Sequence, residues 1–196
     1  FDIKGKAQGV PVHALFGGPV RDRVQAYWSH CGSYRIRHGA LVGKPPVHTF
    51  DDIKKLGAEV RERGFKALKT GMVSMADGKF TNFGPGFAFT PGWPAMNIDH
   101  HAIATTVKMM EAFRDGAGPT VKLGLDLNFH FKPEACMRIA RVLEPFNMHW
   151  LEIDRYDPDA LLQIKQSTST KICTGENLYY MHDYLPYFER HAADVF

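Results

Sequence analysis

Three carboxylates stand at the ends of three short apolar runs in the second half of the chain. They are Asp126, Glu152 and Glu176, and they follow one another at intervals of roughly 25 residues, about one strand–helix unit of an α/β protein. If the runs are parallel strands of a barrel, their carboxyl ends open onto one face, where the side chains would converge. Converging carboxylates repel one another unless a proton or a cation neutralises them, and Mg²⁺ prefers oxygen ligands. The spacing therefore predicts a Mg²⁺ site on these three acids, although each acid taken alone would more often be a solvated loop residue or a helix cap.

Lys69 lies near the end of an earlier apolar run, two units before Glu152. At the same mouth its ammonium could hold the carboxylate of a substrate, or act as a base if its pKa were lowered. The alternative is a surface lysine whose stem lies along the strand end. We predict that Lys69 is one of the catalytic residues.

Polar side chains also follow Asp126 and Glu152 at alternate positions. Asn128 and His130 would point to the same side as Asp126 if the strand conformation continues, and Asp154 stands in the same relation to Glu152. Asn128 is predicted to bind the substrate or orient the metal site, and His130 to act as a general acid. Asp154 is predicted to bind the substrate or to support the metal ligands. For His130, a solvent-exposed loop histidine is an equal alternative.

The segments that must position these side chains alternate between strand and helix. Strand patterns cover residues 23–31, 65–71, 121–127, 149–153 and 171–175, and a sixth strand begins at residue 193. Helical patterns cover residues 1–15, 50–63, 98–114, 133–143, 158–166 and 181–191. This alternation predicts an α/β fold with a parallel sheet. Residues 72–97 form a long, aromatic interval rich in Gly and Pro, for which we expect an ordered lid or an interface loop.

The composition is that of an ordinary globular domain. The 196 residues are 44% hydrophobic and 23% charged, with a formal net charge of +3. This weak and dispersed charge predicts no nucleic-acid partner, and no run approaches the roughly 20 apolar residues of a membrane span. The three cysteines include no Cys-x-x-Cys pair, which favours reduced thiols and a cytoplasmic protein.

Several runs resemble motifs of the mandelate racemase/muconate-lactonizing branch of the enolase superfamily. Residues 2–18, DIKGKAQGVPVHALFGG, resemble the segment that joins the family's capping domain to its barrel. Residues 64–69, GFKALK, resemble the run that leads to a Lys-x-Lys motif on the second strand. The runs Asp126-x-Asn128, Leu151-Glu152 and Gly175-Glu176 resemble the family's three metal-ligand motifs.

The resemblance implies a parallel (β/α) barrel of TIM type, incomplete here at about five to six of eight units. Residues 1–18 would be a linker helix from an N-terminal α+β capping domain that this chain lacks, and residues 19–196 a partial barrel catalytic domain. The reaction step that the resemblance implies is Mg²⁺-assisted removal of the proton α to a carboxylate, which gives an enediolate. The partner would be a small carboxylate substrate, and the family precedent favours a homo-oligomer.

Departures from the family pattern narrow the predicted reaction. The second lysine of Lys-x-Lys falls on Gly71, which removes one base and favours a one-sided elimination. Together with the long aromatic interval after it, this predicts a Mg²⁺-dependent lyase that dehydrates a sugar acid. One alternative is a racemase, epimerase or cycloisomerase of the same branch, and another is a non-catalytic relative or fragment with a binding role. The family's main base, a His–Asp pair, is expected beyond residue 196.

Overall fold

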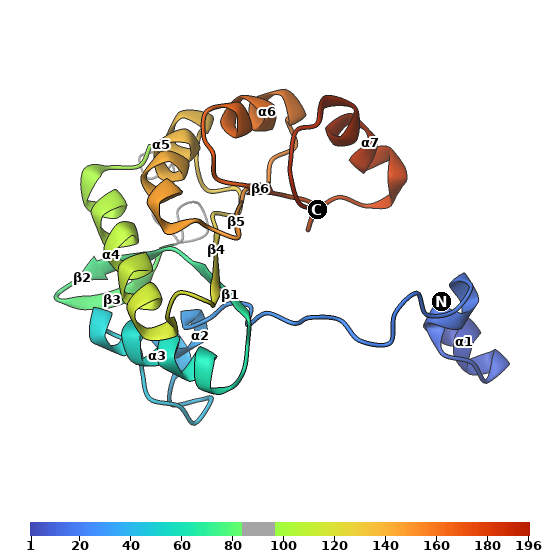
Figure 1. Cartoon of the computed structure of the whole chain (residues 1–196), viewed down its shortest axis with the longest axis horizontal. Helices are drawn as coiled ribbons and strands as arrows, with labels where there is room; N and C mark the ends of the chain where they lie inside the picture. Colours follow the sequence, from blue (N-terminus) through green and yellow to red (C-terminus); the bar gives the residue numbers. More distant parts are fainter. Residues whose placement is uncertain (84–96) are drawn as a thin grey trace.

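A computed structural model describes residues 1–83 and 97–196 of the chain. Its central sheet has four parallel strands, hydrogen-bonded to one another in chain order. They are β1 (Ala67–Gly71), β4 (Lys122–Asp126), β5 (Trp150–Glu152) and β6 (Ile172–Cys173). Helices connect the strands and lie in an arc outside them (Figure 1). This arrangement is part of a (β/α) barrel of TIM type, as the sequence predicted.

The helices form where the sequence supplies both an apolar stripe and a start signal. In α3, Thr49 and Asp52 make a reciprocal capping box, and α5 and α6 have Pro in the first turn. The predictions for residues 50–63, 133–143 and 158–166 are confirmed to within one residue. The connecting helices are α3 (Phe50–Glu62), α4 (His100–Ala117), α5 (Pro133–Leu143), the 3-10 turn η2 (Glu144–Phe146), α6 (Pro158–Gln166) and α7 (Tyr180–Arg190).

The core lies between the sheet and the helices. Leu123 and Leu125 of β4 are fully buried there, together with Met109 of α4 and Ile139 of α5. Because successive strand residues point to opposite faces, Gly124 and Asp126 of the same strand face away from these helices. Strand alternation thus assigns one face of the sheet to packing and leaves the other for the polar side chains.

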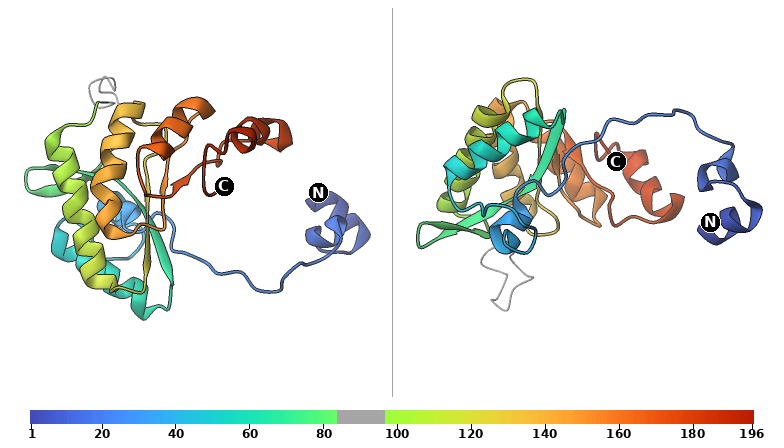
Figure 2. Two further views of the ribbon diagram at one scale, coloured as in Figure 1. Left: turned by 45° about the horizontal axis from the view of Figure 1, so that its top comes forward. Right: turned by 90° about the horizontal axis from the view of Figure 1, so that it is seen from below.

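The N-terminal part differs from the sequence prediction. Residues 1–15 form two short helices, α1 (Asp2–Gln8) and the 3-10 helix η1 (Val12–Phe16), because Gly9 takes a left-handed conformation and Pro11 follows it. They stand apart from the sheet at the end of an extended stretch (Figures 1 and 2). The strand predicted at residues 23–31 is reduced to one bridge, between Trp28 and Leu68. The role of residues 1–18 as a link to a capping domain stays a prediction.

Two further elements were not predicted. Helix α2 (Ser33–His38) lies between the segments at residues 23–31 and 50–63, where no element was predicted. An antiparallel hairpin of β2 (Val73–Ala76) and β3 (Lys79–Asn82) follows β1 directly. The hairpin turns at Asp77-Gly78, both with positive φ, and Asp-Gly is a strong hairpin signal that was available in the sequence. Residues 84–96, which belong to the interval expected to form an ordered lid or an interface loop, lie outside the described residues. None of the helices in the described ranges is long and apolar enough to cross a membrane.

Candidate metal centre

The parallel register of β4 and β5 places Asp126 opposite Glu152, each at the last position of its strand. Lys69 of β1 reaches the same point from the other side of β4. Its Nζ lies 2.8 Å from Oδ2 of Asp126 and 2.9 Å from each carboxylate oxygen of Glu152. All three residues are buried, at 5–7% exposure. The structure therefore brings together three of the predicted site residues at the carboxyl ends of the strands.

Neighbouring groups hold the two carboxylates in place. The backbone N–H of Asn128 donates to Oδ1 of Asp126 at 2.9 Å, and the indole N–H of Trp150 donates to Oε2 of Glu152 at 3.2 Å. The Trp150 ring lies against Gly124, where a Cβ would stand 3.4 Å from the indole nitrogen. Sequence analysis missed Trp150 and Gly124, although each stands two residues before one of the acids and so shares its face.

Asp154 joins this cluster from the loop after β5. Asp126, Glu152 and Asp154 each offer a carboxylate oxygen within 4.8 Å of the others, and Asp154 is only 3% exposed. Its Oδ2 is buried and has no hydrogen-bond partner among residues 1–83 and 97–196. A buried polar atom that lacks a partner is costly, and three hard oxygen donors at this separation suit a divalent cation such as Mg²⁺. The residues present therefore fit the metal that the sequence predicted.

The charges in the cluster perturb one another. Burial and the nearby charge of Asp126 raise the pKa of Glu152 above its usual range, although Lys69 opposes the shift. Burial raises the pKa of Asp154 to about 7, with added repulsion from Glu176, Asp126 and Glu152. Burial disfavours the Lys69 ammonium, but its contacts with Asp126 and Glu152 outweigh that effect and raise its pKa. The centre thus holds more negative charge than one ammonium neutralises.

The remaining predicted site residues lie around this cluster. Glu176 is exposed, and its carboxylate accepts a hydrogen bond from the side-chain amide of Asn177, so it stands outside the group of three acids. Its role as a metal ligand stays a prediction. The strand conformation does not continue past Asp126, because Asn128 adopts a left-handed φ of 50°. His130 is half-buried, and burial lowers its pKa while the charge of Asp126 acts in the opposite direction.

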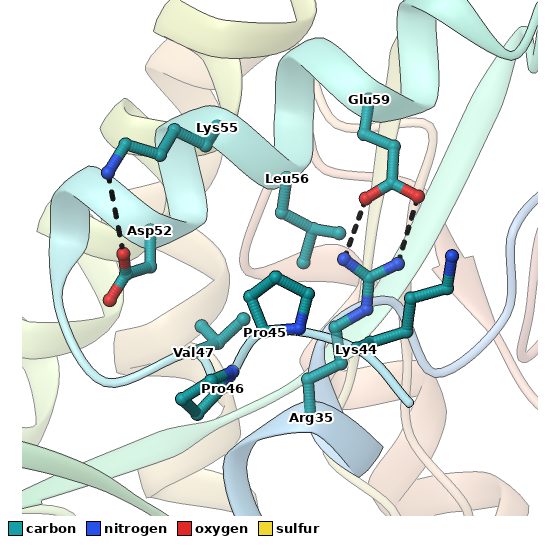
Figure 3. A pocket seen from close by; sticks show the side chains of 9 residues that line it. All are labelled: Arg35, Lys44, Pro45, Pro46, Val47, Asp52, Lys55, Leu56 and Glu59. Atoms are coloured by element: carbon teal, nitrogen blue, oxygen red, sulfur yellow. Dashed lines mark hydrogen bonds and ion pairs between the residues drawn. The ribbon is translucent and has the colours of Figure 1, made fainter. Parts of the chain in front are cut away.

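A separate pocket of about 320 Å³ lies between α2, α3 and the loop around Pro45 (Figure 3). Four of its charged groups form two pairs: Arg35 donates two hydrogen bonds to Glu59, at 2.6 and 2.9 Å, and Lys55 lies 3.7 Å from Asp52. Because these ion pairs are already made, the pocket offers weaker support for chemistry than the buried acid cluster.

Solved structures similar to this chain include a "putative L-alanine-DL-glutamate epimerase" from Burkholderia xenovorans. It is 41% identical, with a TM-score of 0.90, over 98% of this chain and 48% of that one. A structure of the same description, bound to magnesium and fumarate, is 40% identical and covers 97% of this chain and 47% of that one, again with a TM-score of 0.90.

Curated relatives are more distant in sequence. The D-galactonate dehydratase family member ManD of Chromohalobacter salexigens is 26% identical, over 93% of this chain and 44% of its own length. The D-gluconate dehydratase of Thermoproteus tenax is 26% identical, over 100% of this chain and 34% of its own. The chain thus spans less than half the length of the relatives it matches. The family described as enolase C-terminal domain-like matches residues 52–196, and the chain belongs to this family, within the mandelate racemase/muconate-lactonizing group of the enolase superfamily.

Proposed function

We propose that this chain carries the metal-binding part of the active site of a Mg²⁺-dependent dehydratase that acts on a sugar acid. The observation that supports the proposal is the buried cluster of Asp126, Glu152 and Asp154 at the carboxyl ends of β4 and β5. The names of the curated relatives, which include a D-gluconate dehydratase, supply the substrate class. A sugar acid has the carboxylate, the α proton and the neighbouring hydroxyl that such an elimination needs.

We assign the ion to Asp126 and Glu152, with Asp154 of the same buried cluster as a further oxygen donor. Glu176 is assigned as the third ligand on the sequence pattern. When bound, Mg²⁺ would supply positive charge for the substrate carboxylate and so make its α proton more acidic. Lys69 would donate a hydrogen bond to the same carboxylate. The raised pKa of Lys69 keeps its side chain protonated, so it is suited to bind the substrate and poorly suited to remove a proton.

The elimination removes the α proton and expels the hydroxyl of the next carbon as water, so it needs a base and an acid. We assign Asn128 to substrate binding and His130 to the acid, because both follow Asp126. Burial lowers the pKa of His130, so the neutral imidazole dominates at neutral pH, and His130 must take up a proton before it can act as the acid. The base is assigned to none of these residues.

An epimerase is the second candidate, and the 41% identical structure from Burkholderia xenovorans favours it. Epimerisation removes the α proton and returns it on the other face, which in the simplest case needs two bases. At the end of β1, Gly71 stands opposite Asp126 in the register and offers no basic side chain. Gly71 therefore favours elimination over a two-base epimerisation.

The two functions are separated by incubating the complete protein with Mg²⁺ and a panel of sugar acids and of dipeptides of alanine and glutamate. A dehydratase forms a 2-oxo acid, which carbonyl reagents detect. An epimerase in D₂O exchanges the α proton of its substrate for deuterium and forms no 2-oxo acid. Activity should disappear with EDTA and in Glu152→Gln and Glu176→Gln, and persist in Glu62→Gln, which changes an exposed residue of α3. Activity that survives EDTA would contradict the need for a metal ion. Activity that survives Glu176→Gln would contradict the assignment of Glu176 as a ligand.

A further inference from the structure

Every carboxylate oxygen of Asp126 and Glu152 already has a hydrogen-bond donor or cation from this chain. Asp126 Oδ1 accepts from the Asn128 N–H and Oδ2 faces the Lys69 ammonium at 2.8 Å. Both oxygens of Glu152 lie 2.9 Å from the same ammonium, and Oε2 also accepts from Trp150. Lys69 thus contacts three of the four oxygens that these two acids can offer to an ion.

The same centre has a charge imbalance. Asp126, Glu152 and Asp154 are three buried carboxylates, and among the residues that the structure describes Lys69 is the single ammonium that contacts two of them. Asp154 contributes a buried oxygen that has no hydrogen-bond partner in the described part of the chain. A divalent ion would balance the charge, but its ligands from β4 and β5 are the oxygens that Lys69 contacts.

We propose that Lys69 is an internal competitor of the divalent ion: its ammonium holds Asp126 and Glu152, and the ion binds by displacing it from their oxygens. This inference rests on the proposed function, since it concerns the same metal. It gives Lys69 two opposite effects. The ammonium stabilises two acids that face each other in the parallel register, and it weakens binding of any cation to them.

Removing the charge separates this role from two simpler ones. If Lys69 only supported the fold, Lys69→Met would lower both the stability of the protein and its affinity for the metal. If Lys69 only contacted the substrate, the affinity for the metal would not change. Of the three roles, only that of a competitor predicts that the Lys69→Met variant is less stable without the metal and yet binds the metal more tightly.

The experiment measures Mn²⁺ binding to the complete protein, with free Mn²⁺ followed by electron paramagnetic resonance. Thermal unfolding is measured in parallel, in EDTA and in excess Mn²⁺. We expect Lys69→Met to bind Mn²⁺ at least tenfold more tightly than the unsubstituted protein, and to melt at a lower temperature in EDTA. Mn²⁺ should raise its melting temperature by more than that of the unsubstituted protein. Lys66→Met is the matched control, because Lys66 is an exposed lysine just before the same strand, and it should change neither quantity.

Lys69→Gln, which is neutral but keeps a hydrogen-bond donor, is the second variant in case the first does not fold. Recovery of folding of either variant by Mn²⁺ supports the competitor role. Mn²⁺ affinity equal to or weaker than that of the unsubstituted protein, or failure of both variants to fold even in Mn²⁺, overturns it. In those cases the proposed function stands as long as the unsubstituted protein binds Mn²⁺. If the unsubstituted protein binds no Mn²⁺, the metal assignment of the proposed function fails as well.

Discussion

Replacing Asp154 by Asn should change how the stability of the protein depends on pH. Asp154 is buried, and burial together with the charges of Glu176, Asp126 and Glu152 raises its pKa from 3.8 to about 7. An unfolded chain loses this proton near pH 4, whereas the folded protein keeps it until near neutrality. Between these values the folded state binds more protons than the unfolded state, so the free energy of unfolding falls as the pH rises.

The size of the effect follows from the shift. A difference of about three pKa units is worth about 4 kcal/mol, at 1.36 kcal/mol per unit. This is an upper bound for Asp154 alone, because the neighbouring acids titrate together with it. The Asn variant has no proton to lose at this position. Its free energy of unfolding should therefore change less between pH 5 and pH 8 than that of the unsubstituted protein, by at most about 2.7 kcal/mol, because about two of the three pKa units fall inside this pH range.

The assay is urea unfolding followed by tryptophan fluorescence at several pH values from 5 to 8, in EDTA. Asp22→Asn, in the exposed extended stretch before β1, is the control and should keep the pH dependence of the unsubstituted protein. Added Mg²⁺ should restore the stability of the unsubstituted protein above pH 7, because the ion replaces the lost proton as the neutralising charge. Equal pH dependence in the Asp154→Asn variant and the unsubstituted protein would refute the reasoning.

Three further predictions concern other parts of the structure. Gly116→Ala should lower stability by about 1–3 kcal/mol, because a Cβ there would overlap the carbonyl oxygen of Lys54 where α3 and α4 touch; an unchanged melting temperature would contradict this close approach. Thr49→Ala removes the hydroxyl that accepts a hydrogen bond from the Asp52 N–H in the capping box of α3. The free energy of unfolding in urea should fall by about 1 kcal/mol, whereas Thr49→Ser should change it little. The His130 imidazole should titrate below 6.5 in an NMR experiment, and lower still in Asp126→Asn, since the Asp126 charge raises its pKa; a midpoint above 6.5 would show that burial does not dominate.

The parts of the fold that the sequence predicted are those where one local pattern decides the outcome. Helix α5 begins at Pro133 and repeats its apolar residues at helical spacing, so both its type and its ends could be read directly. The segment at residues 23–31 has a strand pattern as well, yet it forms an isolated bridge with β1 at Trp28 and one further hydrogen bond, from the Cys31 N–H to the Lys69 carbonyl oxygen. Pairing depends on distant partners, and its extent could not be obtained from the segment alone.

The site was predictable where alternation within a strand holds. Asp126 and Glu152 end their strands in register, and their meeting follows from that parity. The prediction for Asn128 assumed that the strand continues past Asp126. The strand ends at Asp126, and Asn128 has a positive φ, so the alternation of side chains along a strand does not apply to it. The ion pairs of Lys69 depend on a contact across 83 positions of sequence between Lys69 and Glu152, so only the folded structure shows them. The oligomeric state stays a prediction.

The buried trio of Lys69, Asp126 and Glu152 also limits how the protein can diverge over generations. Loss of one partner of a buried ion pair leaves an uncompensated charge and costs about 3–5 kcal/mol, a large part of the roughly 5–15 kcal/mol by which a domain is stable. Loss of Lys69 alone is therefore severe when no metal ion is bound, whereas a change that removes Lys69 together with one of the acids leaves the net charge of the trio unchanged. We expect lineages to inherit the three residues as a unit or to exchange them in compensating pairs, so that a descendant without Lys69 would already have lost an acid and, with it, a ligand.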